Sequence, residues 1–265
     1  MRRLIVIAGI LLGLAMPVTA QERVVHISII IDDLGNQWRS GLRAIKLPGQ
    51  ITYAILPHTP HSINLAHKAN DAGREVMLHF PMASSRRLRP GPGTVDVSMN
   101  QAGFITQARE NLAAIPFIRG VNNHMGSQVT PSLKHMSWLM DDLAKRGGLY
   151  FVDSMTIGSS VAGITAREKG IPMVRRDVFL DHHRDTKKIH RQFQRLLDLA
   201  KRRGYAVAIG HPYPETLAML EAELPRLAAQ GIELVSVSTL IQRYRQQGPV
   251  IWQASLSPSP VVSKN

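Results

Sequence analysis

The chain has no cysteine, few acidic residues and a single long hydrophobic run. In a sequence of 265 residues, the absence of cysteine excludes a disulfide scaffold and thiolate metal sites. The hydrophobic run, residues 4–16, is shorter than the roughly 20 residues that a membrane-spanning helix needs. Asp and Glu number 19 against 32 Lys and Arg, so the formal net charge is +13.

The N-terminal segment has the layout of a secretory signal peptide. Arg2 and Arg3 precede the hydrophobic run, which ends in Pro17 and the small residues up to Ala20. This layout predicts a signal peptide over residues 1–20, cleaved after Ala20, and an exported protein of the periplasm or cell envelope. After cleavage no stable membrane span is expected, although an uncleaved anchor is the alternative. An exported chain with a charge of +11 meets anionic envelope polymers and lipid headgroups rather than nucleic acid.

Short hydrophobic segments alternate with amphipathic ones along residues 21–247. The segments that read as strands are 24–31, 51–56, 75–78, 118–121, 149–152, 171–174 (extending toward 180), 205–209 and 232–235. Such alternation predicts a parallel sheet covered by helices. Nearly eight strands in one domain favour a distorted (β/α) barrel of about seven to eight strands over an open doubly wound sheet. Residues 248–265, rich in Ser and Pro, predict a disordered tail.

Four helices have recognisable ends. Thr59-Pro60 opens one that stops at Gly73, and Thr130-Pro131 opens another that stops at Gly147. Two more are expected over residues 185–204 and 214–231, with Pro225 kinking or splitting the second. Within the third, Lys188, Arg191 and Arg195 form one stripe, which we interpret as a solvated face in preference to a polymer-binding groove.

Polar side chains follow almost every predicted strand. Ile29-Ile30-Ile31 runs directly into Asp32 and Asp33, and adjacent carboxylates repel each other unless a cation or a proton lies between them. Other strands end in histidine or aspartate: His58, His79, His124, Asp153, Asp181 with His182 and His183, and His211. Because the carboxyl ends of parallel strands meet on one side of a barrel or sheet, these residues predict a shared polar site.

The residue types at these ends suit metal-assisted hydrolysis. Aspartate with two or more imidazoles is a ligand set for zinc or another divalent metal, which would also explain the adjacent carboxylates. One carboxylate can bind the metal while the other takes a proton from water, and a histidine opposite can protonate the leaving group. Spacing alone leaves amide, ester and phosphate substrates open.

An ordered set of short motifs over residues 24–245 resembles the divergent polysaccharide deacetylases. The motifs are Ile-Ile-Ile-Asp-Asp-Leu-Gly, Leu-Pro-His, Leu-His-Phe-Pro-Met, Asn-Asn-His-Met-Gly-Ser, Phe-Val-Asp-Ser and Ile-Gly-His-Pro. The resemblance implies a distorted barrel of the carbohydrate esterase type and an envelope protein that acts on N-acetylated glycans such as peptidoglycan. It also implies that Asp32 is the general base, Asp33 a metal ligand and His211 the general acid.

The sequence departs from the better-known deacetylases in its metal ligands. Those enzymes take two imidazoles from one His-x-x-x-His segment, whereas here His79 is followed four residues later by Ala83. The second imidazole is therefore expected from His124, which gives a predicted ligand set of Asp33, His79 and His124 for a divalent metal, zinc first. The arginine-bearing segment that follows strand four in those enzymes is not recognisable.

Three further residues are candidates for contact with substrate. Asp153 is expected either to orient His211 or to touch the sugar, with a strand-end hydrogen bond as the structural alternative. Tyr213 and Trp38 could stack on a pyranose ring, although packing explains each equally simply. His58, His182 and His183 are left as rim residues.

Two other functions remain open from the sequence. The first is a metal-dependent phosphoesterase, which a basic chain suits but which needs carboxylates for a second metal. The second is a catalytically degenerate member of the fold that binds a glycan or a cell-wall protein, which the missing His-x-x-x-His pair favours. The hydrolase interpretation is preferred because Asp32, Asp33, His79, His124 and His211 are all present.

Overall fold

The computed structural model describes residues 24–86 and 88–245. The predicted signal peptide, residues 1–20, and the predicted tail, residues 248–265, lie outside the described residues. Within the described part of the chain, no helix is long and hydrophobic enough to cross a membrane.

Nine strands within these residues form one parallel sheet. In chain order they are β1 (Val25–Leu34), β2 (Thr52–Ile55), β3 (Glu75–Met82), β4 (Ile118–Met125), β5 (Tyr150–Asp153), β6 (Met173–Arg175), β7 (Val178–Phe179), β8 (Tyr205–Gly210) and β9 (Ile232–Leu234). Their order in the sheet is β6-β5-β4-β3-β2-β1-β8-β7. The short β9 pairs with the beginning of β1, and β2 pairs with its end.

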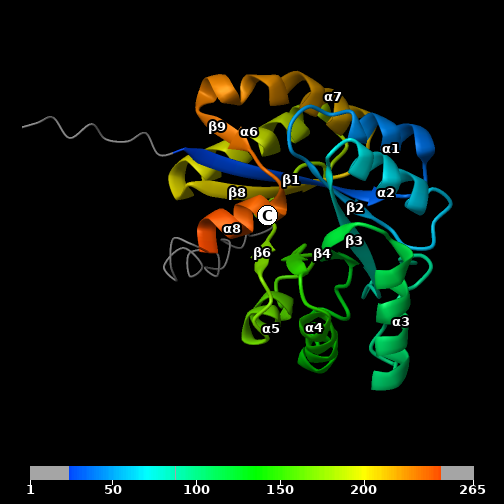
Figure 1. The fold of residues 1–265 in the computed structure, drawn as a ribbon. Helices are drawn as coiled ribbons and strands as arrows, with labels where there is room; N and C mark the ends of the chain where they lie inside the picture. Colours follow the sequence, from blue (N-terminus) through cyan, green and yellow to red (C-terminus); the bar gives the residue numbers. More distant parts are fainter. Residues whose placement is uncertain (1–23, 87, 246–265) are drawn as a thin grey trace, which may run out of the picture.

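The sheet curls into an incomplete barrel. Within the described residues no ladder joins β6 to β7, so the barrel is open between these two edge strands. Helices cover its outside, with α6 and α7 on one side and α3, α4 and α5 on the other (Figure 1). The predicted distorted barrel of about seven to eight strands is therefore confirmed, with β7 as a separate short strand where the prediction extended the preceding one.

The predicted helices are present, and the structure adds others. The helices are α1 (Trp38–Ile45), α2 (Ser62–Asp71), α3 (Gln101–Ala114), α4 (Leu133–Arg146), α5 (Ala162–Glu168), α6 (Thr186–Arg203), α7 (Pro214–Glu223) and α8 (Val237–Arg245). Asp185 caps α6 by accepting a hydrogen bond from the Lys188 backbone N–H (2.8 Å), and Gly204 ends it in the left-handed conformation. Pro225 splits the segment after α7 into short 3-10 turns, as predicted.

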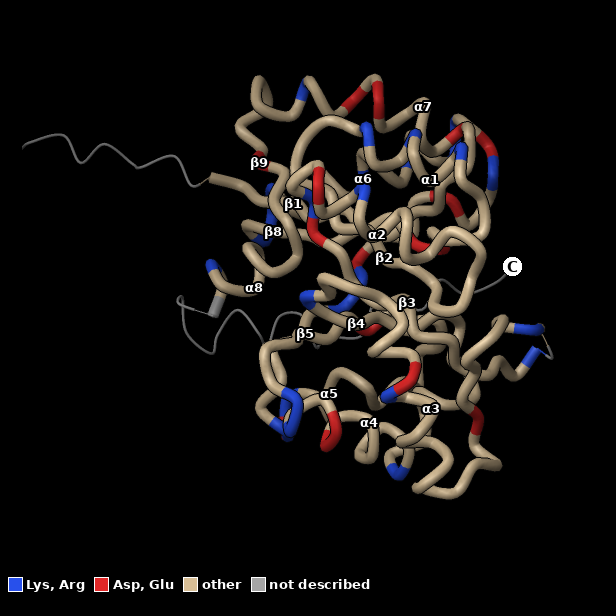
Figure 2. The backbone as a smooth tube through the Cα atoms, turned by 45° about the vertical axis from the view of Figure 1, so that its right-hand side comes forward, with Lys and Arg blue, Asp and Glu red and all other residues tan. Residues whose placement is uncertain are grey.

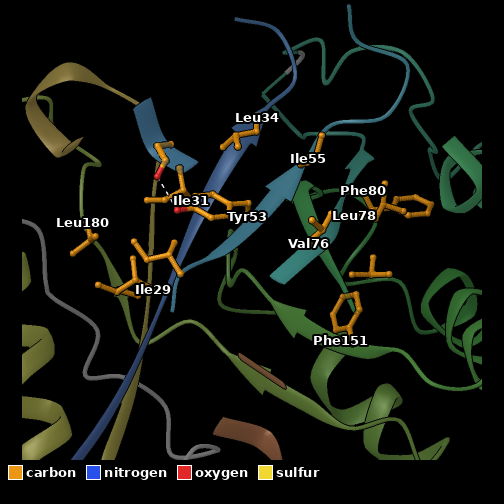
Figure 3. Close-up of a cluster of buried hydrophobic side chains, with 14 of the residues drawn as sticks. Ile29, Ile31, Leu34, Tyr53, Ile55, Val76, Leu78, Phe80, Phe151 and Leu180 are labelled. Atoms are coloured by element: carbon orange, nitrogen blue, oxygen red, sulfur yellow. Dashed lines mark hydrogen bonds between the residues drawn. The ribbon is translucent and has the colours of Figure 1, made fainter. Parts of the chain in front are cut away.

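Alternation along the strands sorts the hydrophobic residues into two clusters. On β1, Ile29 and Ile31 face the outer helices, as Figure 3 shows for the larger cluster, whereas Ile30 faces the barrel interior. The Tyr53 hydroxyl, in the outer cluster, donates to the Ala44 carbonyl of α1 (2.7 Å). A parallel sheet buried on both faces explains why β1 reads as a continuous run of isoleucine.

The N-terminal end of the barrel is closed by α8. Its buried residues Val237, Leu240 and Ile241 pack with the interior strand residues. Beside them, Glu75 Oε1 accepts hydrogen bonds from the Tyr150 hydroxyl (2.8 Å), the Thr52 hydroxyl (3.0 Å) and the Ser238 backbone N–H (3.2 Å). The interior is therefore a packed core, and only the opposite end can hold a site built from strand ends.

Candidate metal centre

A β-bulge at the end of β1 brings Asp32 and Asp33 to the same place. The pairing with β2 advances by three residues on β1, from Ile31 to Leu34, but by only two on β2. The extra residue is accommodated by Asp33 in the left-handed conformation, with a φ of 60°. Side chains of adjacent strand residues normally point to opposite faces, and the bulge re-aims one of them. Gly35 follows with a φ of 126°, where a side chain would collide with Thr59.

Three ligand atoms from β1, β3 and β4 converge beside this bulge. Asp33 Oδ1 lies 3.1 Å from His79 Nε2 and 3.0 Å from His124 Nδ1, and the two imidazole nitrogens are 3.0 Å apart. Nevertheless, Asp33 Oδ1 is buried and accepts no hydrogen bond within the described residues. The structure thus brings together the three residues that the sequence analysis selected as metal ligands.

Asn122 fixes how His79 presents its nitrogens. The Asn122 amide donates to Asp32 Oδ1 (2.8 Å), so its Oδ1 must accept from His79 Nδ1 at 2.7 Å. A neutral His79 therefore carries its proton on Nδ1 and directs the lone pair of Nε2 toward Asp33 and His124. The same amide holds Asp32, whose other oxygen, Oδ2, lies 3.5 Å from His79 Nε2.

The donor set fits a divalent cation. A carboxylate oxygen and two imidazole nitrogens that face one another at 3.0–3.1 Å are a favourable arrangement only when a proton or a metal cation lies among them. Ligands on one zinc ion at about 2.0–2.2 Å in tetrahedral geometry lie roughly 3.3–3.6 Å apart, a few tenths of an ångström more than the separations here. Asp33 Oδ1, His79 Nε2 and His124 Nδ1 would hold such an ion, with one side left open.

The two adjacent carboxyl groups have pKa values shifted in opposite directions. Burial raises the pKa of Asp32, against the opposing effect of the His79 and His211 charges. Burial also acts to raise the pKa of Asp33, but the imidazoles of His124 and His79 outweigh it and hold that pKa well below the usual range. Carboxyl groups whose environments separate their pKa values are suited to different roles, here Asp32 as a base and Asp33 as a ligand.

His211 faces the cluster from the end of β8. Its Nε2 lies 3.7 Å from Asp33 Oδ2, and its Nδ1 donates to Asp181 Oδ1 (2.9 Å). Asp181 is itself fixed by the His211 backbone N–H (2.6 Å) and the Thr216 hydroxyl (2.7 Å). Burial acts to lower the pKa of His211, but the hydrogen bond and charge of Asp181 outweigh it and raise that pKa to about 9. His211 is therefore a proton donor at neutral pH.

Two aromatic rings pack against the His211 ring. Tyr213 stacks on it at a centroid distance of 5.3 Å and an angle of 26°, and Phe179 lies at 5.3 Å and 35°. The guanidinium of Arg184 lies 4.4 Å from the Tyr213 ring centre, and that of Arg176 lies 5.0 Å from the Phe179 ring centre. The predicted contact residue Tyr213 thus borders the cluster directly.

The other two predicted contact residues lie outside the cluster. Asp153 is buried and accepts hydrogen bonds from the Met155 backbone N–H (2.9 Å) and the Ser160 hydroxyl (2.8 Å). Its expected role of orienting His211 is wrong, because Asp181 makes that contact. Alternation along β5 turns Asp153 toward α5, opposite to the interior-facing Val152. The partly buried Trp38 packs against the hydrophobic core at the start of α1, with its ring 5.8 Å from that of His61.

Two residues complete the site: Asn122, which the sequence analysis did not select, and Asp181, which it placed at a strand end without a role. Asn122 lies two residues before His124, and that spacing on a strand places both side chains on the same face. Asp181 directly precedes His182 and His183, which are exposed, and only the pairing of β7 with β8 brings it to His211. His58 forms a hydrogen bond with Asn111 (3.0 Å) rather than with a residue of the cluster.

The fold and this cluster define a parallel α/β barrel with a candidate one-metal centre at the carboxyl ends of its strands. The chain belongs to the divergent polysaccharide deacetylase family, whose model matches residues 29–241. It is 36% identical over 240 residues to the uncharacterized protein YibQ of Escherichia coli K12, covering 91% of this chain and 73% of that protein.

Solved structures share the fold. An uncharacterized protein, ATU2773 from Agrobacterium tumefaciens C58, superposes with a TM-score of 0.79 at 25% identity, covering 83% of this chain and 91% of that one. The peptidoglycan deacetylase PdaC from Bacillus subtilis superposes with a TM-score of 0.52 at 14% identity, covering 88% of this chain and 98% of that one. At such low sequence identity, the superposition with PdaC shows only that the fold is shared.

Proposed function

We propose that this protein is a metal-dependent hydrolase of the cell envelope that removes acetyl groups from an N-acetylated glycan. The observation that carries the proposal is the convergence of Asp33, His79 and His124, whose acceptor atoms lie 3.0–3.1 Å apart without hydrogen bonds to Asp33 Oδ1. Family membership supports the glycan substrate, and the predicted signal peptide supports export to the periplasm.

The residues around the cluster have distinct roles in this reaction. Asp33, His79 and His124 would hold a divalent metal, zinc first, and such a metal would supply Lewis-acid polarisation of the acetamide carbonyl and would make bound water more acidic. Asp32, held through Oδ1 by Asn122, takes the proton from the attacking water with Oδ2. His211, protonated and oriented by Asp181, donates the proton from Nε2 to the departing amine. The products are acetate and a sugar with a free amino group.

The ligand arrangement favours this chemistry over a phosphoesterase. Within residues 24–86 and 88–245, the structure holds one group of three or more His, Asp or Glu side chains able to bind a common ion. Two-metal phosphoesterases need further carboxylates beside the first site. The buried Asn122 and Asp181 favour a working site over a relic, because they support the proposed base and the proposed acid.

The first test is the zinc content and zinc affinity of the purified protein. We expect near-stoichiometric zinc in the parent and none in the Asp33→Ala, His124→Ala double variant. The matched control is His67→Ala, Asp71→Ala, which removes the same residue types from the exposed face of α2 and should leave zinc unchanged. A parent protein that binds no divalent metal would overturn the proposal.

The second step is the release of acetate from oligomers of N-acetylglucosamine. We expect release by the zinc-loaded parent and the α2 control and none by the Asp33→Ala, His124→Ala variant. If the parent binds zinc tightly and also binds the oligomer but releases no acetate, the catalytically degenerate alternative replaces the hydrolase.

A further inference from the structure

The outward face of α6 carries cations that the described part of the chain does not neutralise. Its exposed basic side chains have no ion pair with any residue of 24–86 or 88–245, and five of them lie on the side away from the barrel: Lys187, Lys188, Arg191, Arg195 and Arg202, with Lys201 as the sixth. The single acidic residue of the helix, Asp198, is exposed three positions after Arg195 and four before Arg202, so this side of the helix carries one negative charge against its cations. Its buried residues, Ile189, Phe193 and Leu196 among them, lie nearly opposite this basic face. We define these five cations as the α6 basic face.

Packing does not account for this row of charges. Lys187, Arg191 and Arg195 follow one another at four-residue intervals, so their side chains are neighbours on the helix surface. Like charges at that spacing destabilise a helix, whereas a helix selected only for solubility gains from alternating signs. The fold needs only the opposite face of α6, which packs against β8 and α7.

The α6 basic face begins at the candidate metal centre. Arg184, directly before α6, lies over the ring of Tyr213, and Tyr213 stacks on His211. From there α6 runs back along the outside of the barrel between β7 and β8, and basic segments lie along it (Figure 2). A helix of 18 residues is about 27 Å long, so the basic face is a track leading away from the site.

The absence of hydrophobic residues on the α6 basic face helps to decide between two kinds of anionic partner, a membrane surface and a soluble polyanion. A helix that binds a membrane surface inserts hydrophobic side chains between the headgroups. Large exposed hydrophobic residues of the described chain lie on other elements: Val24, Ile63, Leu88, Val97, Phe117, Leu133 and Ile164. The α6 basic face therefore suits a soluble polyanion rather than a bilayer.

We propose that the α6 basic face binds an anionic polysaccharide, a glycan chain carrying carboxylate or phosphate groups, which enters the site beside Tyr213 and His211. The proposal rests on the proposed function for the glycan nature of the ligand. The binding itself involves salt-dependent contacts between cations and the charged groups of the chain and requires no turnover.

The test is the binding of labelled anionic oligosaccharides to the full chain, followed by fluorescence anisotropy. Oligogalacturonate supplies carboxylates and a phosphomannan oligomer supplies phosphates, so the tighter ligand identifies the anion. We expect the Lys187→Gln, Arg191→Gln, Arg195→Gln variant to bind at least about tenfold more weakly, because each cation facing an anionic surface contributes to affinity. Added salt should weaken binding to the parent more than to this variant.

The control variant removes the same charge elsewhere. Lys46, Lys68 and Lys145 are exposed on other helices or their ends, and their triple change to Gln should leave affinity nearly unchanged. If both variants bind the oligosaccharides equally more weakly than the parent, the effect depends only on net charge, and the proposal is overturned. Parent binding to both anionic oligomers no tighter than to neutral pullulan would also overturn it. A third result would overturn it as well: the α6 variant no longer binds phosphatidylglycerol vesicles but still binds the oligosaccharides as the parent does.

Zinc content is measured in the same samples to separate this proposal from the preceding one. The α6 variant is expected to keep the zinc of the parent, because no residue of the α6 basic face touches the ligands. Full zinc content without oligosaccharide binding in the parent would overturn the role of the α6 basic face and leave the metal centre standing.

Discussion

At the N-terminal end of the barrel, Glu75 Oε1 accepts hydrogen bonds from three donors, whereas at the C-terminal end Asp33 Oδ1 accepts none. Both ends contain histidine as well. At the N-terminal end His26 Nδ1 contacts the Tyr244 hydroxyl (3.1 Å), which in turn donates to the Gly204 carbonyl (2.6 Å). At the C-terminal end, His79 Nε2 lies 3.0 Å from His124 Nδ1 and 3.1 Å from Asp33 Oδ1.

This difference separates a polar cluster with a satisfied acceptor from one whose acceptor has no hydrogen bond. Buried polar groups stabilise a fold when each has a partner and destabilise it when they do not. The C-terminal end also holds backbone strain, since Asp33, Met125 and Met155 have φ values of 60°, 53° and 48° at or just after their strands. Strained backbone conformations of this kind persist only where the surrounding structure imposes them, and they are more frequent at functional sites than elsewhere.

The largest expected effect comes from Asp33→Asn at the unpaired end. The variant should lose zinc and about 1000-fold of its activity, because a metal supplies several kcal/mol of charge stabilisation in the transition state. Zinc content and acetate release check this, and a variant that keeps its zinc would contradict the role of Asp33 as a ligand.

His211→Gln is expected to separate proton donation from metal binding. Acetate release should fall at least about 100-fold, the usual contribution of a positioned acid. Zinc affinity should stay at the parental value, because His211 is not among the three ligands. Competition with a chromophoric chelator measures the affinity, and a joint loss of zinc and activity would show that His211 is a ligand instead.

Asn122→Ala should weaken the metal centre without removing a ligand. Loss of the amide leaves the His79 tautomer unfixed, and such supporting groups contribute about 10–100-fold to metal affinity. The control is Asn123→Ala, whose side chain bonds to the Met125 carbonyl and the Ser154 backbone N–H rather than to a ligand. Equal zinc affinities of the two variants would contradict the role of Asn122.

The smallest effect is expected from Glu75→Ala at the N-terminal end, and it should be purely structural. The change leaves the Tyr150 hydroxyl and the Ser238 N–H without their acceptor, which costs about 1–3 kcal/mol of unfolding free energy. Zinc content should not change. Glu75→Gln keeps an acceptor oxygen, so its stability in thermal unfolding should be close to that of the parent. A loss of zinc in either variant would contradict the distinction between the two ends of the barrel.

The strands and the residues at their ends could be read from the sequence because both are local patterns. Isoleucine runs, Thr-Pro openings and terminal glycines each identify an element without reference to the rest of the chain. Helix α3 lacks such a pattern, because its buried positions include Asn111 beside Phe104, Ala108 and Leu112. The barrel class followed from the number and alternation of these elements.

The partners of the site residues could not be read in the same way. Asn122 contacts His79, which lies 43 residues away in the sequence, and Asp181 contacts His211, which lies 30 residues away. Only the register of neighbouring strands brings these residues together. The bulge that brings Asp32 and Asp33 together is an extra residue on β1 relative to β2. Neither segment, taken by itself, contains a signal for this extra residue. The assignment of Asp153 failed for this reason, because strand-end position does not reveal which face a side chain occupies.

The central place of β1 has a consequence for how the chain folds. The first strand pairs with β8 and β9, which lie about 180 and 207 positions later, and α8 completes the interior last of all. A chain made from its N-terminus therefore exposes one side of β1 until residues 205–245 arrive. Contacts so distant in sequence close slowly, and unpaired strand edges invite association during the delay. A chain that ended before β8 would leave that side of β1 exposed permanently.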